Sequence, residues 1–147
     1  MRILVTGGAG YIGSHTLLQL LLAGHEALVF DNFSNSSPVA LQRVGSLANA
    51  TFDVIEGDIR DPVALNQAFS QFQPDAVVHF AGLKAVGESN EQPLEYYSQN
   101  VAGSVELLKA MDQADCRRIV FSSSATVYGE ADYLPYDEQH RLLPTNP

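Results

Sequence analysis

Short apolar runs alternate with longer amphipathic stretches along this chain. The apolar runs predict strands over residues 2–6, 26–30, 52–56, 76–80 and 118–122, and the stretches between them predict helices over residues 12–23, 39–47, 61–72 and 93–114. The first run, RILVT, is apolar at its centre and ends in glycines, which is typical of a strand buried on both faces of a parallel sheet. Repeated strand–helix alternation implies right-handed crossovers, so we predict an α/β fold with a doubly wound parallel sheet of about five strands.

Local signals support three of these helices. Gly24 follows the first helix as a stop, and Asp61 with Pro62 forms the N-cap and first-turn pair that opens the third. The long helix is predicted to bury one stripe of side chains at helical spacing: Val101, Val105, Leu108 and Met111. From Tyr128 onward, glycine, proline and mixed charges predict loop.

Composition limits the partners that the chain is expected to have. Its 147 residues fit one domain, and the sequence has no repeat and no linker-like stretch. The balance of 8 basic against 17 acidic residues disfavours nucleic acid and anionic membranes. No apolar run approaches the roughly 20 residues that cross a bilayer, and glycines follow the first apolar residues too soon for a signal peptide. Cys116 is the only cysteine, which suits a reducing cytosol, so we predict a cytoplasmic protein.

The first predicted strand ends in a glycine motif that carries chemistry. Gly7, Gly10 and Gly13 form G-x-x-G-x-x-G, a variant of the dinucleotide fingerprint. The first glycine permits a tight turn, the second lets a pyrophosphate approach the backbone, and the third lets helix and strand pack closely. The free N–H groups of Tyr11 and Ile12 would then face the anion. Three spaced glycines can also form an ordinary strand-to-helix turn.

Asp31 makes the dinucleotide interpretation much stronger. It ends the second predicted strand, close to the expected spacing of about 20 residues from the motif. A carboxylate there can accept both hydroxyls of the adenosine ribose and would repel a 2′-phosphate. The sequence therefore predicts a Rossmann-type domain that binds NAD rather than NADP.

Later strand ends add candidates for the same site. Asp58 and Ile59 follow the third strand and could flank the adenine, although Asp58 could equally cap the following turn. Small residues after the fourth strand, in Phe80-Ala81-Gly82, would let a cofactor come close. Lys84 could meet a hydroxyl or phosphate of the cofactor or substrate, or could be a solvated surface charge.

These residues resemble the extended short-chain dehydrogenase/reductases and, within them, the UDP-glucose (UDP-galactose) 4-epimerases. VTGGAGYIGSH and GDIRD look like the wider family. More specific are DNFSNS over residues 31–36, HFAGLKAVGES over 79–89, PLEYY over 93–97 and FSSSATVYG over 121–129. The resemblance runs through essentially the whole chain.

Position by position, the resemblance implies a set of NAD contacts that extends the one argued above. The set comprises Tyr11, Ile12, Asp31, Asn32, Asn35, Ser36, Asp58, Ile59, Phe80, Ala81, Gly82 and Lys84. Asn100 falls in the family's N-V-x-G motif, and Gln99 stands where some members have a cofactor-contacting asparagine.

The serines after the fifth strand match the family's sugar site. The resemblance implies that Ser124 assists a catalytic tyrosine at the sugar's 4-hydroxyl and that Ala125, Thr126 and Lys84 contact the substrate. By composition alone, this stretch could be a plain polar turn. Related 4,6-dehydratases carry an acidic pair aligned with Ala125 and Thr126, so this chain is not expected to dehydrate its substrate.

The implied reaction interconverts UDP-glucose and UDP-galactose by oxidation at C4, rotation of the 4-keto sugar and re-reduction. The family's tyrosine and lysine form a Tyr-x-x-x-Lys motif, and none of the six tyrosines here has a lysine four residues later. The family places this motif after a proline like Pro147. Residues 1–147 are therefore expected to be the NAD-binding part of a truncated enzyme with an incomplete sheet, inactive alone, whose family typically forms homodimers.

Two other functions stay open from the sequence. The chain could be a non-catalytic dinucleotide-binding module, or part of a related NAD-dependent nucleotide-sugar oxidoreductase. A metal site has little support, because the four histidines lack ligand spacing and are more typical of ordinary core or surface positions: His15, His25, His79 and His140.

Overall fold

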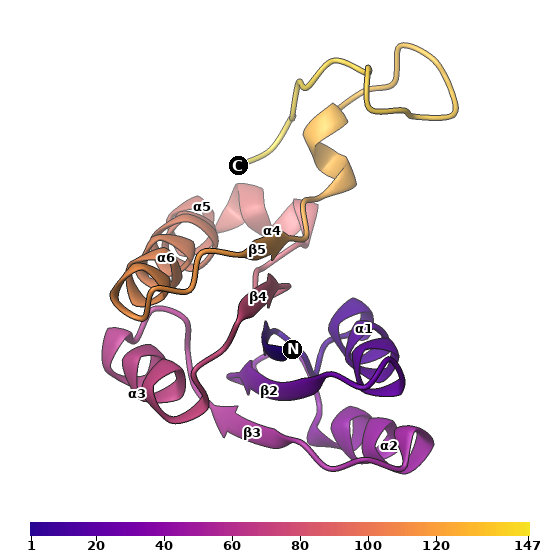
Figure 1. Ribbon diagram of the computed structural model, residues 1–147. Helices are drawn as coiled ribbons and strands as arrows, with labels where there is room; N and C mark the ends of the chain where they lie inside the picture. Colours follow the sequence, from indigo (N-terminus) through magenta and orange to yellow (C-terminus); the bar gives the residue numbers. More distant parts are fainter.

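Five parallel strands form one sheet in the computed structural model, which describes residues 1–147 (Figure 1). The strands are β1 (Arg2–Thr6), β2 (Glu26–Asp31), β3 (Asp53–Glu56), β4 (Ala76–His79) and β5 (Ile119–Phe121). The first three connecting helices are α1 (Tyr11–Leu22), α2 (Pro38–Ala48) and α3 (Pro62–Phe72). After β4 come α4 (Val86–Glu91), α5 (Pro93–Tyr96), the π-helix η1 (Tyr97–Ala102), α6 (Gly103–Gln113) and, beyond β5, the 3₁₀ turn η2 (Ala125–Tyr128). The predicted Rossmann-type architecture is confirmed.

In the strand order β3-β2-β1-β4-β5, the direction in which successive strands are added to the sheet reverses beside β1. The chain winds outward from β1 to β2 and β3, then returns to pair β4 with the other side of β1. In sheets of this kind, ligands bind beyond the carboxyl ends of the strands at such a reversal. A ligand site is therefore expected beyond the carboxyl ends of β1 and β4.

Side chains of β1 alternate between two hydrophobic cores. Leu4 points to the face covered by α3 and α6, whereas Ile3 and Val5 point to the face covered by α1 and α2 (Figure 1). All three are nearly inaccessible to solvent, at 0–5% exposure. Burial on both faces explains why the strand sequence is apolar at consecutive positions.

The predicted long helix is continuous in direction but not regular. It runs as α5, η1 and α6, with π-helical turns over Tyr97–Ala102. The predicted buried stripe is wrong at three of its four positions, because Val101, Val105 and Leu108 are 53%, 44% and 49% exposed. Only Met111 of that set is buried.

Close packing selects a different face of this helix. Gly103, Leu107, Ala110 and Met111 are buried against the core beneath α3. A Cβ at Gly103 would lie 2.8 Å from Ile59 Cδ1, so the absence of a side chain at Gly103 lets α6 pack closely against Ile59. A stripe of large apolar residues gives no sign of this glycine, so the sequence pattern predicts the wrong face of the helix as the buried one.

Two short elements, α4 and η2, were not predicted, and residues 129–147 contain neither helix nor strand. None of the helices combines the length and apolarity that crossing a membrane requires.

Candidate functional site

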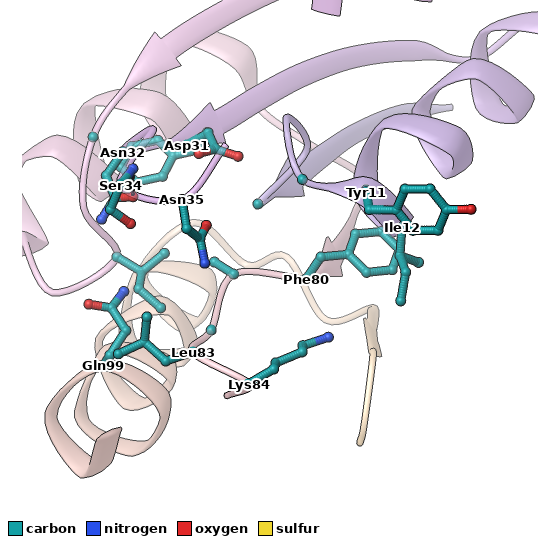
Figure 2. Close-up of a pocket in the computed structure, with 18 residues that line it drawn as sticks. Tyr11, Ile12, Asp31, Asn32, Ser34, Asn35, Phe80, Leu83, Lys84 and Gln99 are labelled. Carbon is teal, nitrogen blue, oxygen red and sulfur yellow. Dashed lines mark hydrogen bonds between the residues drawn. The ribbon is translucent and has the colours of Figure 1, made fainter. Parts of the chain in front are cut away.

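A cleft of about 290 Å³ lies where the carboxyl ends of β1, β2 and β4 meet. Thirteen of the residues that line it were predicted from the sequence: Gly7, Gly10, Tyr11, Ile12, Gly13, Asp31, Asn32, Asn35, Ile59, Phe80, Ala81, Gly82 and Lys84. The lining also includes Phe30, Ser34, Gly57, Leu83 and Gln99 (Figure 2). Ser36, Asp58, Asn100, Ser124, Ala125 and Thr126 do not line it.

The turn over residues 7–13, here called the glycine turn, requires two of its glycines. Gly7 has a φ of +68°, and a Cβ there would lie 2.5 Å from the backbone nitrogen of Ala81. A Cβ at Gly13 would overlap the carbonyl oxygen of Gly7 and lie 2.9 Å from Gly8 Cα. Gly7 thus permits the turn and its contact with the neighbouring strand end, and Gly13 lets α1 begin directly against the turn.

The start of α1 presents unpaired amides to the cleft. The first helical hydrogen bond runs from Ser14 N to Gly10 O at 2.9 Å. The N–H groups of Tyr11, Ile12 and Gly13 therefore have no partner within the helix. Figure 2 shows Tyr11 and Ile12 at one side of the cleft. Free amides at the positive end of a helix dipole can hold a phosphate group.

Asp31 is held rigidly at the end of β2. The residue is 7% exposed, and its carboxylate accepts hydrogen bonds from Ala9 N, Phe33 N and Ser36 Oγ, each at 2.9 Å. A carboxylate offers about four acceptor positions, so capacity remains toward the cleft. Ser36 is predicted as a cofactor contact, and the structure places its hydroxyl behind Asp31 as a support.

Asp58 lies behind the cleft wall in an ion pair with Arg60. Arg60 Nε and Nη2 donate to its two carboxylate oxygens at 3.0 and 2.8 Å, and Asn32 Nδ2 donates at 3.1 Å. The hydrogen bonds from Arg60 lower the pKa of Asp58 to about 2, against an opposing effect of burial. Arg60 also donates to Glu95 at 2.7 Å, which ties α5 to the end of β3.

The loop over residues 80–84, here called the cleft loop, forms the wall opposite Asp31. Lys84 extends from this loop into the cleft space in Figure 2. Asn100 does not face the cleft, because its side chain pairs with Leu83: Oδ1 accepts from Leu83 N at 2.8 Å and Nδ2 donates to Leu83 O at 2.9 Å. Its neighbour Gln99 lines the cleft instead.

The serine segment after β5 forms a capped turn outside the cleft. Ser124 caps η2, with its Oγ accepting from Thr126 N at 3.3 Å and lying 2.8 Å from Thr126 Oγ1. The plain-turn interpretation and a substrate role remain compatible, because capping uses only part of a hydroxyl's hydrogen-bonding capacity. No group of three or more His, Cys, Asp or Glu side chains is placed to hold a metal ion.

His79 ends β4 directly before the cleft loop and is 2% exposed. Burial, with a smaller contribution from the positive charge of Lys84, lowers its pKa from 6.5 to about 4. Between these two values the unfolded chain binds a proton that the folded chain does not, so stability falls as pH decreases through this window.

We expect the free energy of unfolding to fall by about 2 kcal/mol more in the wild-type chain than in His79→Phe when pH is lowered from 7 to 5. Urea denaturation at both pH values measures this difference, since the other titrating groups are shared by the two proteins. Equal losses would contradict the burial of a neutral imidazole at this position.

A doubly wound sheet with a glycine turn, free helix amides and a buried carboxylate at the second strand end defines a dinucleotide-binding fold. Residues 3–147 match the NAD dependent epimerase/dehydratase family, to which the chain belongs.

The most similar relatives include UDP-glucose 4-epimerases from distant organisms. The chain is 54% identical to UDP-glucose 4-epimerase 2 of Arabidopsis thaliana over 148 residues, which cover 99% of this chain and 42% of the relative. It is 51% identical to the Mus musculus UDP-glucose 4-epimerase over 145 residues, with 95% of this chain and 42% of the relative covered. The chain thus spans less than half the length of these relatives.

Solved structures show the same fold. The Bifidobacterium longum UDP-glucose 4-epimerase, in complex with NAD⁺ and UDP, superposes with a TM-score of 0.96 at 45% identity, covering 100% of this chain and 44% of that one. The UDP-Glc/GlcNAc 4-epimerase of Campylobacter jejuni superposes with a TM-score of 0.90 at 38% identity, covering 99% and 44%.

Proposed function

We propose that residues 1–147 are the NAD-binding part of a UDP-glucose 4-epimerase. The observation that carries this proposal is the pairing, across one cleft, of the free amides at the start of α1 with the buried carboxylate of Asp31. The relatives that match almost all of this chain, several of them with NAD bound, support it.

The proposed cofactor fits the residues present. Amides of Tyr11 and Ile12 would hold the pyrophosphate, where side chains are excluded at Gly7 and Gly13. Asp31 would accept the adenosine ribose hydroxyls and, by its charge, exclude a 2′-phosphate. The remaining proposed contacts that line the cleft are Asn32, Asn35, Ile59, Phe80, Ala81, Gly82 and Lys84. Ser36, Asp58 and Asn100 lie outside the cleft lining, and we propose that they act on the cofactor site through the neighbours to which they are hydrogen-bonded.

In the proposed reaction, bound NAD would accept a hydride from C4 of the sugar and then return it to the same carbon. Ser124 would hydrogen-bond the sugar's 4-hydroxyl, and Ala125, Thr126 and Lys84 would contact the substrate. The tyrosine–lysine pair that moves the proton in this family has no counterpart among these 147 residues, because no tyrosine precedes a lysine by four positions. The chain is therefore expected to bind cofactor without catalysing epimerisation.

Calorimetric titration of the chain tests the cofactor assignment. We expect saturable binding of NAD and at least about tenfold weaker binding of NADP, with circular dichroism confirming that the titrated chain is folded. No heat with either NAD or NADH would overturn the proposal. Conversion of UDP-galactose to UDP-glucose by these residues alone would overturn the proposed division of the catalytic groups.

We further propose a cytoplasmic homodimer that acts in galactose metabolism. The exposed face of η1 and α6 supports pairing with a second copy, since Val101, Val105 and Leu108 are 44–53% exposed on adjacent turns. The single cysteine, Cys116, is buried and unpaired, which suits a reducing compartment. Size-exclusion chromatography that shows only monomer at all concentrations would argue against the dimer.

A further inference from the structure

A hydrogen-bonded row of polar side chains, here called the file, runs behind the cleft loop from β1 across β4 to α6. Thr6 Oγ1 lies 2.5 Å from His79 Nδ1, and His79 Nε2 lies 2.9 Å from Ser104 Oγ. Ser104 Oγ in turn donates to the carbonyl oxygen of Asn100 at 2.6 Å. Thr6 and His79 are 0% and 2% exposed, so the side-chain polar groups of both need partners inside the protein.

The direction of each proton in this file follows from the last contact. A carbonyl oxygen only accepts, so the single hydroxyl hydrogen of Ser104 points to Asn100 O. Ser104 Oγ must then accept from His79, which places the imidazole proton on Nε2. The unprotonated Nδ1 accepts the hydroxyl hydrogen of Thr6. The file has one consistent direction, with His79 neutral.

Both ends of the file hold the backbone of the cleft loop. At one end, Thr6 Oγ1 accepts from Ala81 N at 3.4 Å, and Thr6 O accepts from Phe80 N at 2.9 Å. At the other end, the Asn100 side chain pairs with both backbone groups of Leu83. The file therefore fixes the loop from both sides.

The loop in turn supports the glycine turn. The position of a Cβ on Gly7 is filled by the backbone of Ala81, so a shift of the cleft loop would open or compress the turn that precedes the free amides of α1. Asn100 belongs to the π-helical segment η1. In this segment Gln99 lines the cleft, whereas its neighbour Asn100 is hydrogen-bonded to the backbone of Leu83. Such irregular turns are frequent at functional sites.

We propose that Thr6, His79, Ser104 and Asn100 form a positioning network that pre-shapes the cleft loop and glycine turn for the dinucleotide. This inference rests on the proposed NAD-binding function and adds residues that do not themselves touch the cleft. Their effect is to reduce the ordering that the cofactor must impose when it binds.

Ser104→Ala tests the network, with Ser46→Ala as its matched control. Both serines donate to the carbonyl four residues earlier in a helix, Ser104 to Asn100 and Ser46 to Gln42, but Ser46 lies on α2 and is exposed. We expect Ser104→Ala to weaken NAD binding about tenfold and Ser46→Ala to leave it unchanged. Amide exchange at Leu83, measured without NAD, should accelerate about tenfold in Ser104→Ala alone.

A second pair of variants separates positioning from simple loss of stability. Thr6→Ser keeps the hydroxyl and should retain wild-type NAD affinity, whereas Thr6→Val removes it and should lose about tenfold. Nitrogen-15 NMR of the wild-type imidazole should report the neutral Nε2–H form of His79 at pH 7 without any cofactor.

Three results would overturn the network: the Nδ1–H form of His79, equal NAD affinity in Ser104→Ala and Ser46→Ala, or equal affinity in Thr6→Val and Thr6→Ser. If the wild-type chain does not bind NAD, the proposed function fails. The NMR and amide-exchange measurements then decide the network by themselves, since neither needs the cofactor.

Discussion

Replacing Gly13 by alanine is expected to lower NAD affinity by about 100-fold or more and the stability of the chain by about 3 kcal/mol. The new Cβ would overlap the carbonyl oxygen of Gly7 and approach Gly8 Cα to 2.9 Å. These backbone atoms cannot retreat easily, because Gly7 N is hydrogen-bonded to Phe30 O at 2.9 Å and Gly7 abuts Ala81. The start of α1 must therefore move away from the turn, which displaces the amides proposed to hold the pyrophosphate.

Calorimetry with NAD and urea denaturation measure the two effects of Gly13→Ala. Gly87→Ala is a suitable control, because a Cβ at Gly87 meets no atom within 4 Å and the residue lies in α4. Alanine there should leave NAD affinity unchanged and should not destabilise the chain, since alanine is favoured over glycine in helices. Wild-type NAD binding by Gly13→Ala would show that close packing of α1 on the turn is not needed for the site.

The sequence determines the sheet and the glycine turn because their signals are local. Every predicted strand is present, and Asp61 caps α3 through hydrogen bonds from Val63 N and Ala64 N as its position before Pro62 indicates. Gly7, Gly13 and Asp31 line the cleft, as their positions in the sequence predict. Each of them either ends a strand or belongs to the turn that directly follows one, so the position of the strand also fixes the position of the residue. Parallel strands bring such ends to one edge of the sheet, so the site could be assembled from motif positions alone.

Features that depend on packing between distant segments could not be predicted in this way. The buried face of α6 is chosen by Gly103 against Ile59, which an apolar stripe does not reveal. Gly57 also lines the cleft, and only a glycine fits there, because the ring of Phe30 occupies the space of a side chain, with Phe30 Cζ 2.5 Å from the Cβ position.

The polar residues behind the cleft illustrate the same limit. From the sequence, His79 is an ordinary core or surface histidine, and burial agrees with the first description. Its partners Thr6 and Ser104 are 73 and 25 residues away in the chain. No local pattern joins them: the pairing of β1 with β4 brings Thr6 beside His79, and the packing of α6 on the sheet brings Ser104 to the other ring nitrogen.

Asp31→Asn is expected to weaken NAD binding by about tenfold and to raise affinity for NADP relative to NAD by a similar factor. The neutral amide loses the charge that strengthens hydrogen bonds from the ribose hydroxyls, and it no longer repels a 2′-phosphate. Asp31→Ala should weaken NAD binding by about 100-fold. Alanine removes every acceptor and leaves Ala9 N and Phe33 N without their partner, at about 1–3 kcal/mol for each buried group.

Paired titrations of NAD and NADP into the wild-type chain, Asp31→Asn and Asp53→Asn separate the local effect of the carboxylate from that of net charge. Asp53 begins β3 on the surface, so its amide variant removes the same charge without touching the cleft and should keep the wild-type preference. A preference for NAD that survives in Asp31→Asn would show that some other group excludes the 2′-phosphate. An equal change in both asparagine variants would assign the preference to the overall charge of −9 rather than to the end of β2. A change in Asp31→Asn alone is the expected result, because a buried carboxylate anchored by three hydrogen bonds cannot turn away from the bound ribose.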